Sequence, residues 1–191
     1  ASTLKQLLMK VRQRTKVDFS GYKENTVWRR IERRIAANHL STLEDYFLYV
    51  DTDPEELERL SKDILISVTA FFRDKTAFEG LAKTLLKIVQ EKRPGDEVRI
   101  WIAGCATGEE VYSIAMLLCE QAGSVLSRFK VQIFATDLDL NAMATARKGV
   151  YSSASLSELD PPLIAKYFSA RNDSYEVSKL LREMVVFARQ D

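Results

Sequence analysis

The chain has few cysteines and histidines. Its 191 residues include two cysteines, Cys105 and Cys119, and one histidine, His39. Two cysteines are too few for the disulfide framework of a small secreted scaffold. They are also badly placed to pair: Cys119 follows Cys105 along a helix by roughly 15 Å at the helical rise, whereas a disulfide needs Cα atoms within about 7 Å. We therefore expect buried free thiols, a structural His39 and no metal site.

Long apolar runs are also absent. No uncharged stretch approaches the roughly 20 residues of a transmembrane helix, and the N-terminus has no long apolar core of a signal peptide. Hydrophobic residues make up 46% of the chain and charged residues 29%, as in ordinary soluble proteins. The sequence therefore predicts a cytoplasmic protein with no direct membrane insertion.

Charge is balanced overall but unevenly distributed. The formal net charge is +1. Residues 1–40 contain ten Lys and Arg against three Asp and Glu, a net charge of +7, so the remainder of the chain carries −6. A basic segment on an acidic body indicates an anionic partner for that segment.

The first third of the chain predicts a small all-α domain over residues 1–63. Apolar residues follow the i, i+3, i+4, i+7 spacing of an amphipathic helix in residues 2–15 and again in residues 25–38. The apolar face of the second helix consists of Val27, Trp28, Ile31 and Ile35. Much of its opposite side consists of Arg29, Arg30, Arg33 and Arg34. Guanidinium groups bind carboxylates in a bidentate manner, so this face is either solvated or a docking surface for acidic helices.

The stretch V-R-I-W-I-A-G-C-A-T-G-E-E-V-Y at residues 98–112 organises the remainder. Its apolar start predicts a buried strand, which breaks at Gly104, and Glu109 stands at the head of an apolar-periodic helix. A strand, a glycine-containing turn and a helix N-terminus form the first unit of a doubly wound nucleotide-binding sheet. Glycine at such a turn lets the backbone approach a ligand closely.

A second apolar strand, residues 131–135, leads into Thr136-Asp137. The tip of the second strand is where such folds place a carboxylate that holds ribose hydroxyls. We therefore predict an α/β fold in which the all-α domain precedes an incomplete Rossmann-like domain over residues 64–191. Doubly wound domains normally have further strands, so we expect the chain to be truncated at its C-terminus.

Several motifs occur together and in a fixed order. They are F-S-x-Y-K at residues 19–23, R-R-I-E-R-R-I at 29–35, T-A-F-F-R-D at 69–74, T-G-E-E-V-Y-S-I-A at 107–115 and A-T-D-L-D at 135–139. In this combination the chain resembles the chemoreceptor glutamate O-methyltransferases, the CheR family, which transfer a methyl group from S-adenosylmethionine to receptor glutamates and leave S-adenosylhomocysteine. T-A-F-F-R and M-V-V-F-A look most like the variety fused to a methylesterase domain.

The resemblance implies roles for particular residues. Together with the glycine turn, it gives six cofactor contacts: Ser67, Thr69, Arg73, Gly104, Glu109 and Asp137. Arg73 would also be the catalytic residue, and Ser67 stands where many members carry an Asn. The chemistry agrees, because Arg73 can pair with a carboxylate, Glu109 with an ammonium and Asp137 with two hydroxyls. The arginine helix would bind the acidic methylation helices of chemoreceptors. The β-subdomain that binds receptor tails in some members is not visible in the sequence.

Three other functions compete with this one. An NAD-dependent oxidoreductase shares the strand–turn–helix unit, but the turn here is not G-x-G-x-x-G and Glu109 would face a pyrophosphate. A non-catalytic cofactor-binding sensor or scaffold module of a larger signalling protein fits Ser67 and the early C-terminus. An RNA methyltransferase would use the arginine helix on phosphates, but that helix lacks interleaved exposed aromatics, so no nucleic acid is expected as a partner.

Overall fold

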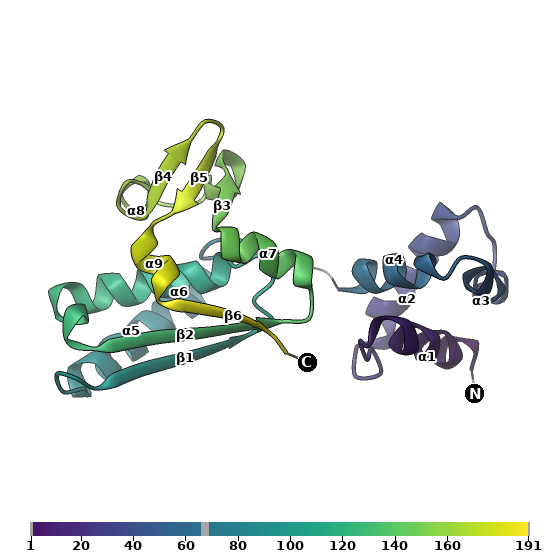
Figure 1. The fold of residues 1–191 in the computed structure, drawn as a ribbon, viewed down its shortest axis with the longest axis horizontal. Helices are drawn as coiled ribbons and strands as arrows, with labels where there is room; N and C mark the ends of the chain where they lie inside the picture. The colour runs from purple at the N-terminus through teal and green to yellow at the C-terminus, as the bar shows by residue number, and fades with distance from the viewer. Residues whose placement is uncertain (1, 66–68, 191) are drawn as a thin grey trace. The chain divides into compact units, whose positions relative to one another are not determined.

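The computed structural model describes residues 2–65 and 69–190. Contacts divide the chain into two compact units, Ala1–Ile66 and Ser67–Asp191, whose elements are labelled in Figure 1. Within the described residues, no helix is both long and apolar enough to cross a membrane.

The first unit is helical throughout its regular structure, as predicted. Its helices are α1 (Thr3–Thr15), α2 (Glu24–Ala37), α3 (Leu43–Thr52) and α4 (Glu55–Ile64). α1 buries Leu7 and Val11, and α2 buries Val27, Ile31 and Ile35, which confirms the predicted apolar stripes. Trp28 departs from this pattern. It is 37% exposed, because it lies at the margin of the stripe.

The second unit contains a parallel sheet in the order β1-β2-β6. Its strands are β1 (Glu97–Ala103), β2 (Lys130–Asp137) and β6 (Val185–Arg189). α5 (Lys75–Glu91) precedes β1. α6 (Glu109–Ala122) and a 3₁₀ segment (Gly123–Arg128) connect β1 to β2, and α7 (Leu140–Lys148) follows β2. The parallel pairing of β1 with β2 confirms the predicted α/β class.

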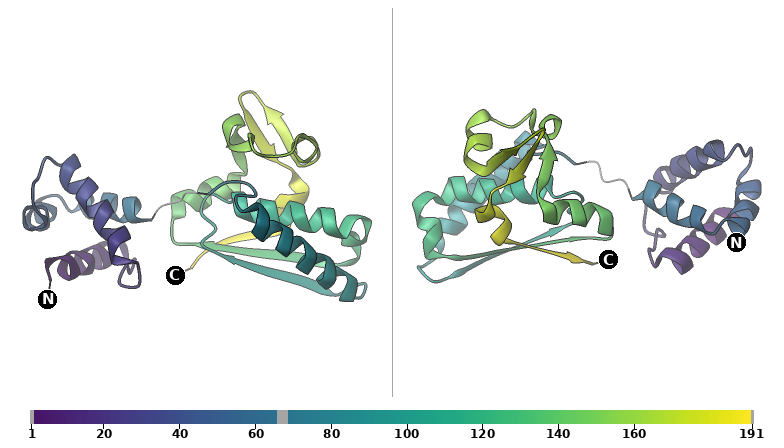
Figure 2. Two further views of the ribbon diagram at one scale, coloured as in Figure 1. Left: turned by 180° about the vertical axis from the view of Figure 1, so that it is seen from behind. Right: turned by 45° about the horizontal axis from the view of Figure 1, so that its top comes forward.

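The sheet buries one face. Leu85 and Val89 of α5 share an apolar cluster with Val98 of β1 and Leu118 of α6, and Figure 2 shows both helices on the same side of the sheet. The expectation of a strand buried on both faces is wrong for β1. Trp101 is 64% exposed, and its indole N–H donates to the Thr136 hydroxyl of β2 at 3.0 Å.

A second, antiparallel sheet lies between α7 and β6 in the chain, in the order β3-β5-β4. It consists of β3 (Val150–Ser152), β4 (Phe168–Arg171) and β5 (Ser174–Val177), with a 3₁₀ turn (Ser153–Leu156), α8 (Pro161–Tyr167) and α9 (Lys179–Glu183). We call residues 150–177 the small-sheet insert. The sequence showed no such subdomain, because the serines and prolines of residues 151–162 favour a loop and only residues 175–177 look like a short strand.

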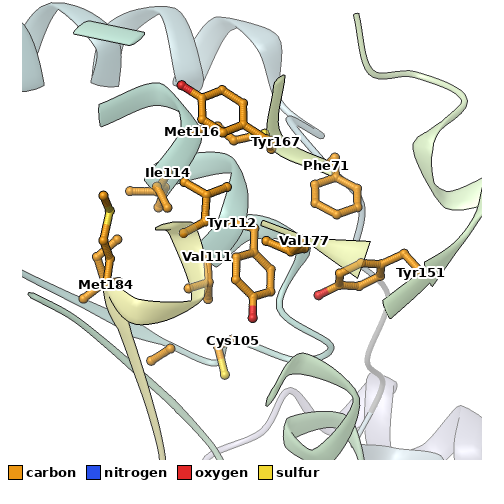
Figure 3. Close-up of a cluster of buried hydrophobic side chains, with 14 of the residues drawn as sticks. Phe71, Cys105, Val111, Tyr112, Ile114, Met116, Tyr151, Tyr167, Val177 and Met184 are labelled. Atoms are coloured by element: carbon orange, nitrogen blue, oxygen red, sulfur yellow. The ribbon is translucent and has the colours of Figure 1, made fainter. Parts of the chain in front are cut away.

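The core of the second unit joins the insert to the parallel sheet. Tyr151 packs there against Phe71 and Tyr112, and Tyr167 is buried in the same cluster near Met116 (Figure 3). Cys105 and Cys119 are also buried, and both are free thiols, as predicted.

Candidate cofactor site

The turn between β1 and α6 carries the glycines that the sequence singled out. Gly104 adopts φ +69°, and a Cβ built there meets no atom within 4 Å. Gly108 adopts φ +95°, and a Cβ there would lie 2.8 Å from the Ala146 Cβ and 2.9 Å from the Tyr151 hydroxyl. Both positions favour glycine for its backbone freedom. Gly108 also needs it for close packing, whereas Gly104 leaves open space above the turn.

Asp137 ends β2 and is bonded to this turn. Its Oδ2 accepts from the Ala106 N–H at 2.7 Å, and its Oδ1 accepts from the Asp139 N–H at 2.8 Å. The turn is held against β2 a second time, because the Cys105 N–H donates to the Thr136 carbonyl at 2.9 Å. An ionised carboxylate has about four lone-pair positions, so Asp137 keeps acceptor capacity for ligand hydroxyls.

Glu109 is the first residue of α6 and is only 8% exposed. Its Oε2 accepts from the Thr107 hydroxyl at 2.6 Å. Asp137 bonds to residue 106 and Glu109 to residue 107, so the two carboxylates flank one turn at the carboxyl ends of β1 and β2. The structure thereby brings together two residues that are 28 positions apart in the sequence.

The segment that contains Thr69 and Arg73 is anchored on α6 near Glu109. The Phe72 N–H donates to the Ser113 hydroxyl at 3.0 Å, and that hydroxyl donates to the Glu109 carbonyl at 2.7 Å. Thr69 is half-buried and Arg73 is exposed. Ser67 lies outside the described residues, so its expected contact stays a prediction.

Cys105 lies in the same turn, but its thiol is unreactive at neutral pH. Burial, followed by the nearby Asp137 carboxylate, raises the pKa of its thiol to about 11. The reactive form of cysteine is the thiolate, which this environment disfavours at neutral pH. Within the described residues, no group of three or more His, Cys, Asp and Glu is arranged to hold a metal ion.

The four arginines of α2 differ in their surroundings. Arg29 and Arg33 are exposed. Arg30 is half-buried, and its buried Nε has no hydrogen-bond partner among the described residues. Arg34 is engaged inside the first unit: it donates to Glu56 Oε1 at 2.7 Å and to Oε2 at 2.6 Å. Of the four arginines that the sequence assigned to a docking surface, only Arg29 and Arg33 are therefore exposed.

Glu56 is fully buried, and its carboxylate is the centre of a hydrogen-bond network. Its Oε1 accepts from the Tyr46 hydroxyl at 2.8 Å and from the Asn38 amide at 2.9 Å, and its Oε2 accepts from Arg59 at 3.3 Å. Burial by itself would raise the pKa of Glu56, but hydrogen bonds from Arg34 and Tyr46 outweigh it and hold that pKa below its ordinary value. The carboxylate therefore stays charged and fixes α2 on α3 and α4.

Parallel strands joined by a glycine-bearing turn and a helix, with one carboxylate at the helix start and one at the end of the second strand, form the unit that opens a doubly wound nucleotide-binding domain. Comparison of the sequence with models of known protein families identifies the particular family. The family model described as "CheR methyltransferase, SAM binding domain" matches residues 67–191, and the one described as "CheR methyltransferase, all-alpha domain" matches residues 2–65. The chain belongs to the CheR methyltransferase family, and S-adenosylmethionine is the cofactor of its second unit.

Similar proteins come from several bacteria. A "Chemotaxis protein methyltransferase 2" of Vibrio cholerae is 32% identical over 93% of this chain and 62% of its own length. A "Chemotaxis protein methyltransferase" of Escherichia coli is 31% identical over 86% of this chain and 55% of its own. An "Uncharacterized 104.1 kDa protein in hypE 3'region" of Rhodobacter capsulatus is 35% identical over 92% of this chain and 18% of its own. The chain thus spans less than two thirds of each relative.

The residues present fit this cofactor. A nucleoside with a charged amino-acid tail needs open backbone, hydroxyl acceptors and a carboxylate for its ammonium. Gly104 provides open space, Asp137 has acceptor capacity, and Glu109 supplies a buried carboxylate. Sequence reasoning missed Ser113 and Tyr151, which support this arrangement from other elements. Nothing local marked Ser113, and Tyr151 lies in a stretch whose serines and prolines favour a loop.

Proposed function

We propose that the protein is an S-adenosylmethionine-dependent protein-glutamate O-methyltransferase that modifies chemoreceptors in chemotaxis-type signalling. One observation carries the proposal: Glu109 and Asp137 flank a single glycine turn at the carboxyl ends of two parallel strands. The names of the Vibrio cholerae and Escherichia coli relatives support the choice of reaction.

In this proposal the cofactor lies across the turn. Asp137 accepts from the ribose hydroxyls, Glu109 pairs with the ammonium, and the open backbone at Gly104 lets the ligand come close. Thr69 and Arg73 bind the methionine carboxylate end, because their segment is anchored on Ser113 of α6, one turn from Glu109. Ser67 completes the set of six contacts. Arg73 serves as the catalytic residue, because by binding the methionine carboxylate it would align the neighbouring sulfonium and its methyl group with the attacking glutamate.

The reaction asks for alignment more than for acid or base catalysis. When bound, the cofactor supplies an activated methyl group on a sulfonium. A receptor glutamate has an ordinary pKa of about 4.3, so it is already an ionised nucleophile at neutral pH. Orientation alone can lower a barrier by roughly 7–11 kcal/mol. A site that holds both partners rigidly therefore needs neither a catalytic triad nor a metal.

The substrate surface in this proposal is the exposed arginine face of α2. Arg29 and Arg33 are four residues apart, so they lie on the same side of the helix. Their guanidinium groups suit the carboxylates of an acidic receptor helix. Arg30 lies to one side of this pair and is half-buried, and Arg34 supports the surface from inside through its ion pair with Glu56.

Cofactor binding and methyl transfer test the proposal separately. In the full-length protein, Asp137→Ala should weaken S-adenosylhomocysteine binding at least tenfold by calorimetry, since loss of hydrogen bonds to an ionised group costs about 1.5–3 kcal/mol each. Wild-type protein should transfer labelled methyl to a receptor fragment. NAD binding without S-adenosylmethionine binding would reject the proposal.

A second candidate is a cofactor-binding sensor or scaffold module within a larger signalling protein. The Rhodobacter capsulatus relative favours it, because the matching segment occupies only 18% of that long chain. The type fused to a methylesterase domain is one such arrangement. Protein that binds cofactor with wild-type affinity but labels no receptor would support this module over the methyltransferase.

A further inference from the structure

Tyr151 connects the small-sheet insert to the glycine turn. It is the central residue of β3, pairs in register with Tyr175 of β5 and is 4% exposed. Its hydroxyl donates to the Thr107 carbonyl at 2.7 Å, across 44 positions of sequence. A buried tyrosine hydroxyl normally finds a partner. Here the partner is the backbone of the turn that carries the candidate site.

Thr107 is held from two sides. Its carbonyl accepts from Tyr151, and its own hydroxyl donates to Glu109 Oε2 at 2.6 Å. The Tyr151 hydroxyl also lies where a side chain on Gly108 would otherwise go, 2.9 Å from the position of a Cβ. The orientation of Thr107, and through it that of the Glu109 carboxylate, therefore depends on the Tyr151 hydroxyl.

The ring of Tyr151 reaches the other half of the site. It packs edge-to-face on Phe71, with ring centroids 5.0 Å apart, and Phe71 packs in the same way on Phe168 at 5.6 Å. Figure 3 shows Phe71 and Tyr151 as neighbours, with Tyr112 beside them. Phe71 is 2% exposed and lies between Thr69 and Arg73 in the chain. One side chain thus contacts both segments that the proposed function places at the methionine end of the cofactor.

We infer that Tyr151 is a positioning residue for the amino-acid end of the cofactor, which it serves by orienting the Thr107–Glu109 pair from the small-sheet insert. The inference rests on the proposed function, since it needs Glu109 to receive the cofactor ammonium. Burial, followed by the nearby Glu109 carboxylate, raises the pKa of Tyr151 above its ordinary value. The phenol therefore remains protonated and available as a donor throughout the physiological pH range.

Two ligands separate positioning from general support of the fold. S-adenosylhomocysteine carries the amino-acid tail, whereas 5′-methylthioadenosine has the same nucleoside without it. In the full-length protein, Tyr151→Phe should weaken S-adenosylhomocysteine binding roughly three- to tenfold, the range of one hydrogen bond, and leave 5′-methylthioadenosine binding unchanged by calorimetry. Thr107→Val, which removes the hydroxyl bonded to Glu109, should give the same selective loss and tests the link from its other end.

Tyr112→Phe is the matched control. Tyr112 is 1% exposed and also donates to a backbone carbonyl, that of Ala146 at 2.8 Å, but this bond does not involve Thr107. Its loss should leave the ratio of the two affinities unchanged. An equal loss of both ligands in Tyr151→Phe, or no loss in Thr107→Val, would overturn the inference alone. Wild-type protein that binds neither ligand would overturn the cofactor assignment as well.

Discussion

The two units build their proposed functional surfaces in different ways. In the first unit, charged side chains on α2 form the surface, and one buried carboxylate, Glu56, holds that helix in place. In the second unit, backbone geometry forms the site: glycines, turn N–H groups and strand ends position Glu109 and Asp137. The comparison teaches that a charged helix face can depend on one buried carboxylate far away in the sequence, whereas the turn at the strand ends depends on local backbone conformation.

The largest expected effect comes from removing the buried carboxylate of the first unit. Glu56→Gln should destabilise this unit by roughly 3–5 kcal/mol, because it removes the main counter-charge of the partly buried Arg34 and leaves only the longer ion pair with Asp63, at 3.6 Å. Urea unfolding followed by Trp28 emission, in a Trp101→Phe background, measures the loss. Glu58→Gln on the same helix is the control, since the Arg14–Glu58 pair is about half exposed and such pairs contribute only ~0–1 kcal/mol.

The same network predicts a pH dependence of known sign. The folded-state pKa of Glu56 lies below the ordinary value of a glutamate side chain. Its contribution is therefore fully present above that value and is lost as pH falls through the folded-state pKa. Wild-type stability of the first unit should fall below about pH 4.5, more steeply than in Glu56→Gln. Identical slopes in the two proteins would show that other acids, such as Asp53, govern acid unfolding.

In the second unit, substitution of the turn glycines is expected to lower stability. Gly108→Ala forces a left-handed conformation that costs about 1–2 kcal/mol, and it adds a methyl 2.8 Å from the Ala146 Cβ, for a further cost of about 1–3 kcal/mol. Gly104→Ala meets no neighbour, so it should cost only the conformational part. Emission of Trp101 in a Trp28→Phe background measures both losses, and equal losses would contradict the packing role of Gly108.

The smallest effect on stability, and the most selective effect on function, is expected at the exposed arginines. Arg29→Glu with Arg33→Glu should lower receptor methylation at low salt on the order of tenfold, since charge steers association, and leave cofactor affinity unchanged. Lys83→Glu with Lys87→Glu on α5 has the same spacing and charge change. If this control lowers methylation equally, net charge and not the α2 surface controls the rate.

The sequence predicted the elements that have strong local signals. The stripes of α1 and α2, the strands that end at Ala103 and Asp137, and the free cysteines all follow from periodicity or spacing. The sequence could not show that Arg34, unlike the other arginines of α2, is engaged inside the first unit, because its partner Glu56 lies 22 positions away. Tyr151 was missed for a related reason: its role is a hydrogen bond across 44 positions, and the short strand around it has no recognisable pattern.

The first and last residues of the small-sheet insert lie next to each other. The Val177 N–H at its end donates to the carbonyl of Gly149, just before its start, at 2.8 Å. Neighbouring entry and exit points are typical of segments that tolerate exchange. In evolution, the insert can therefore be lengthened, shortened or replaced while α7 and α9 keep their places. Such exchange must keep the buried residues that join the insert to the core, such as Tyr167 and Phe168, and a hydroxyl on the first strand that reaches the turn beneath it.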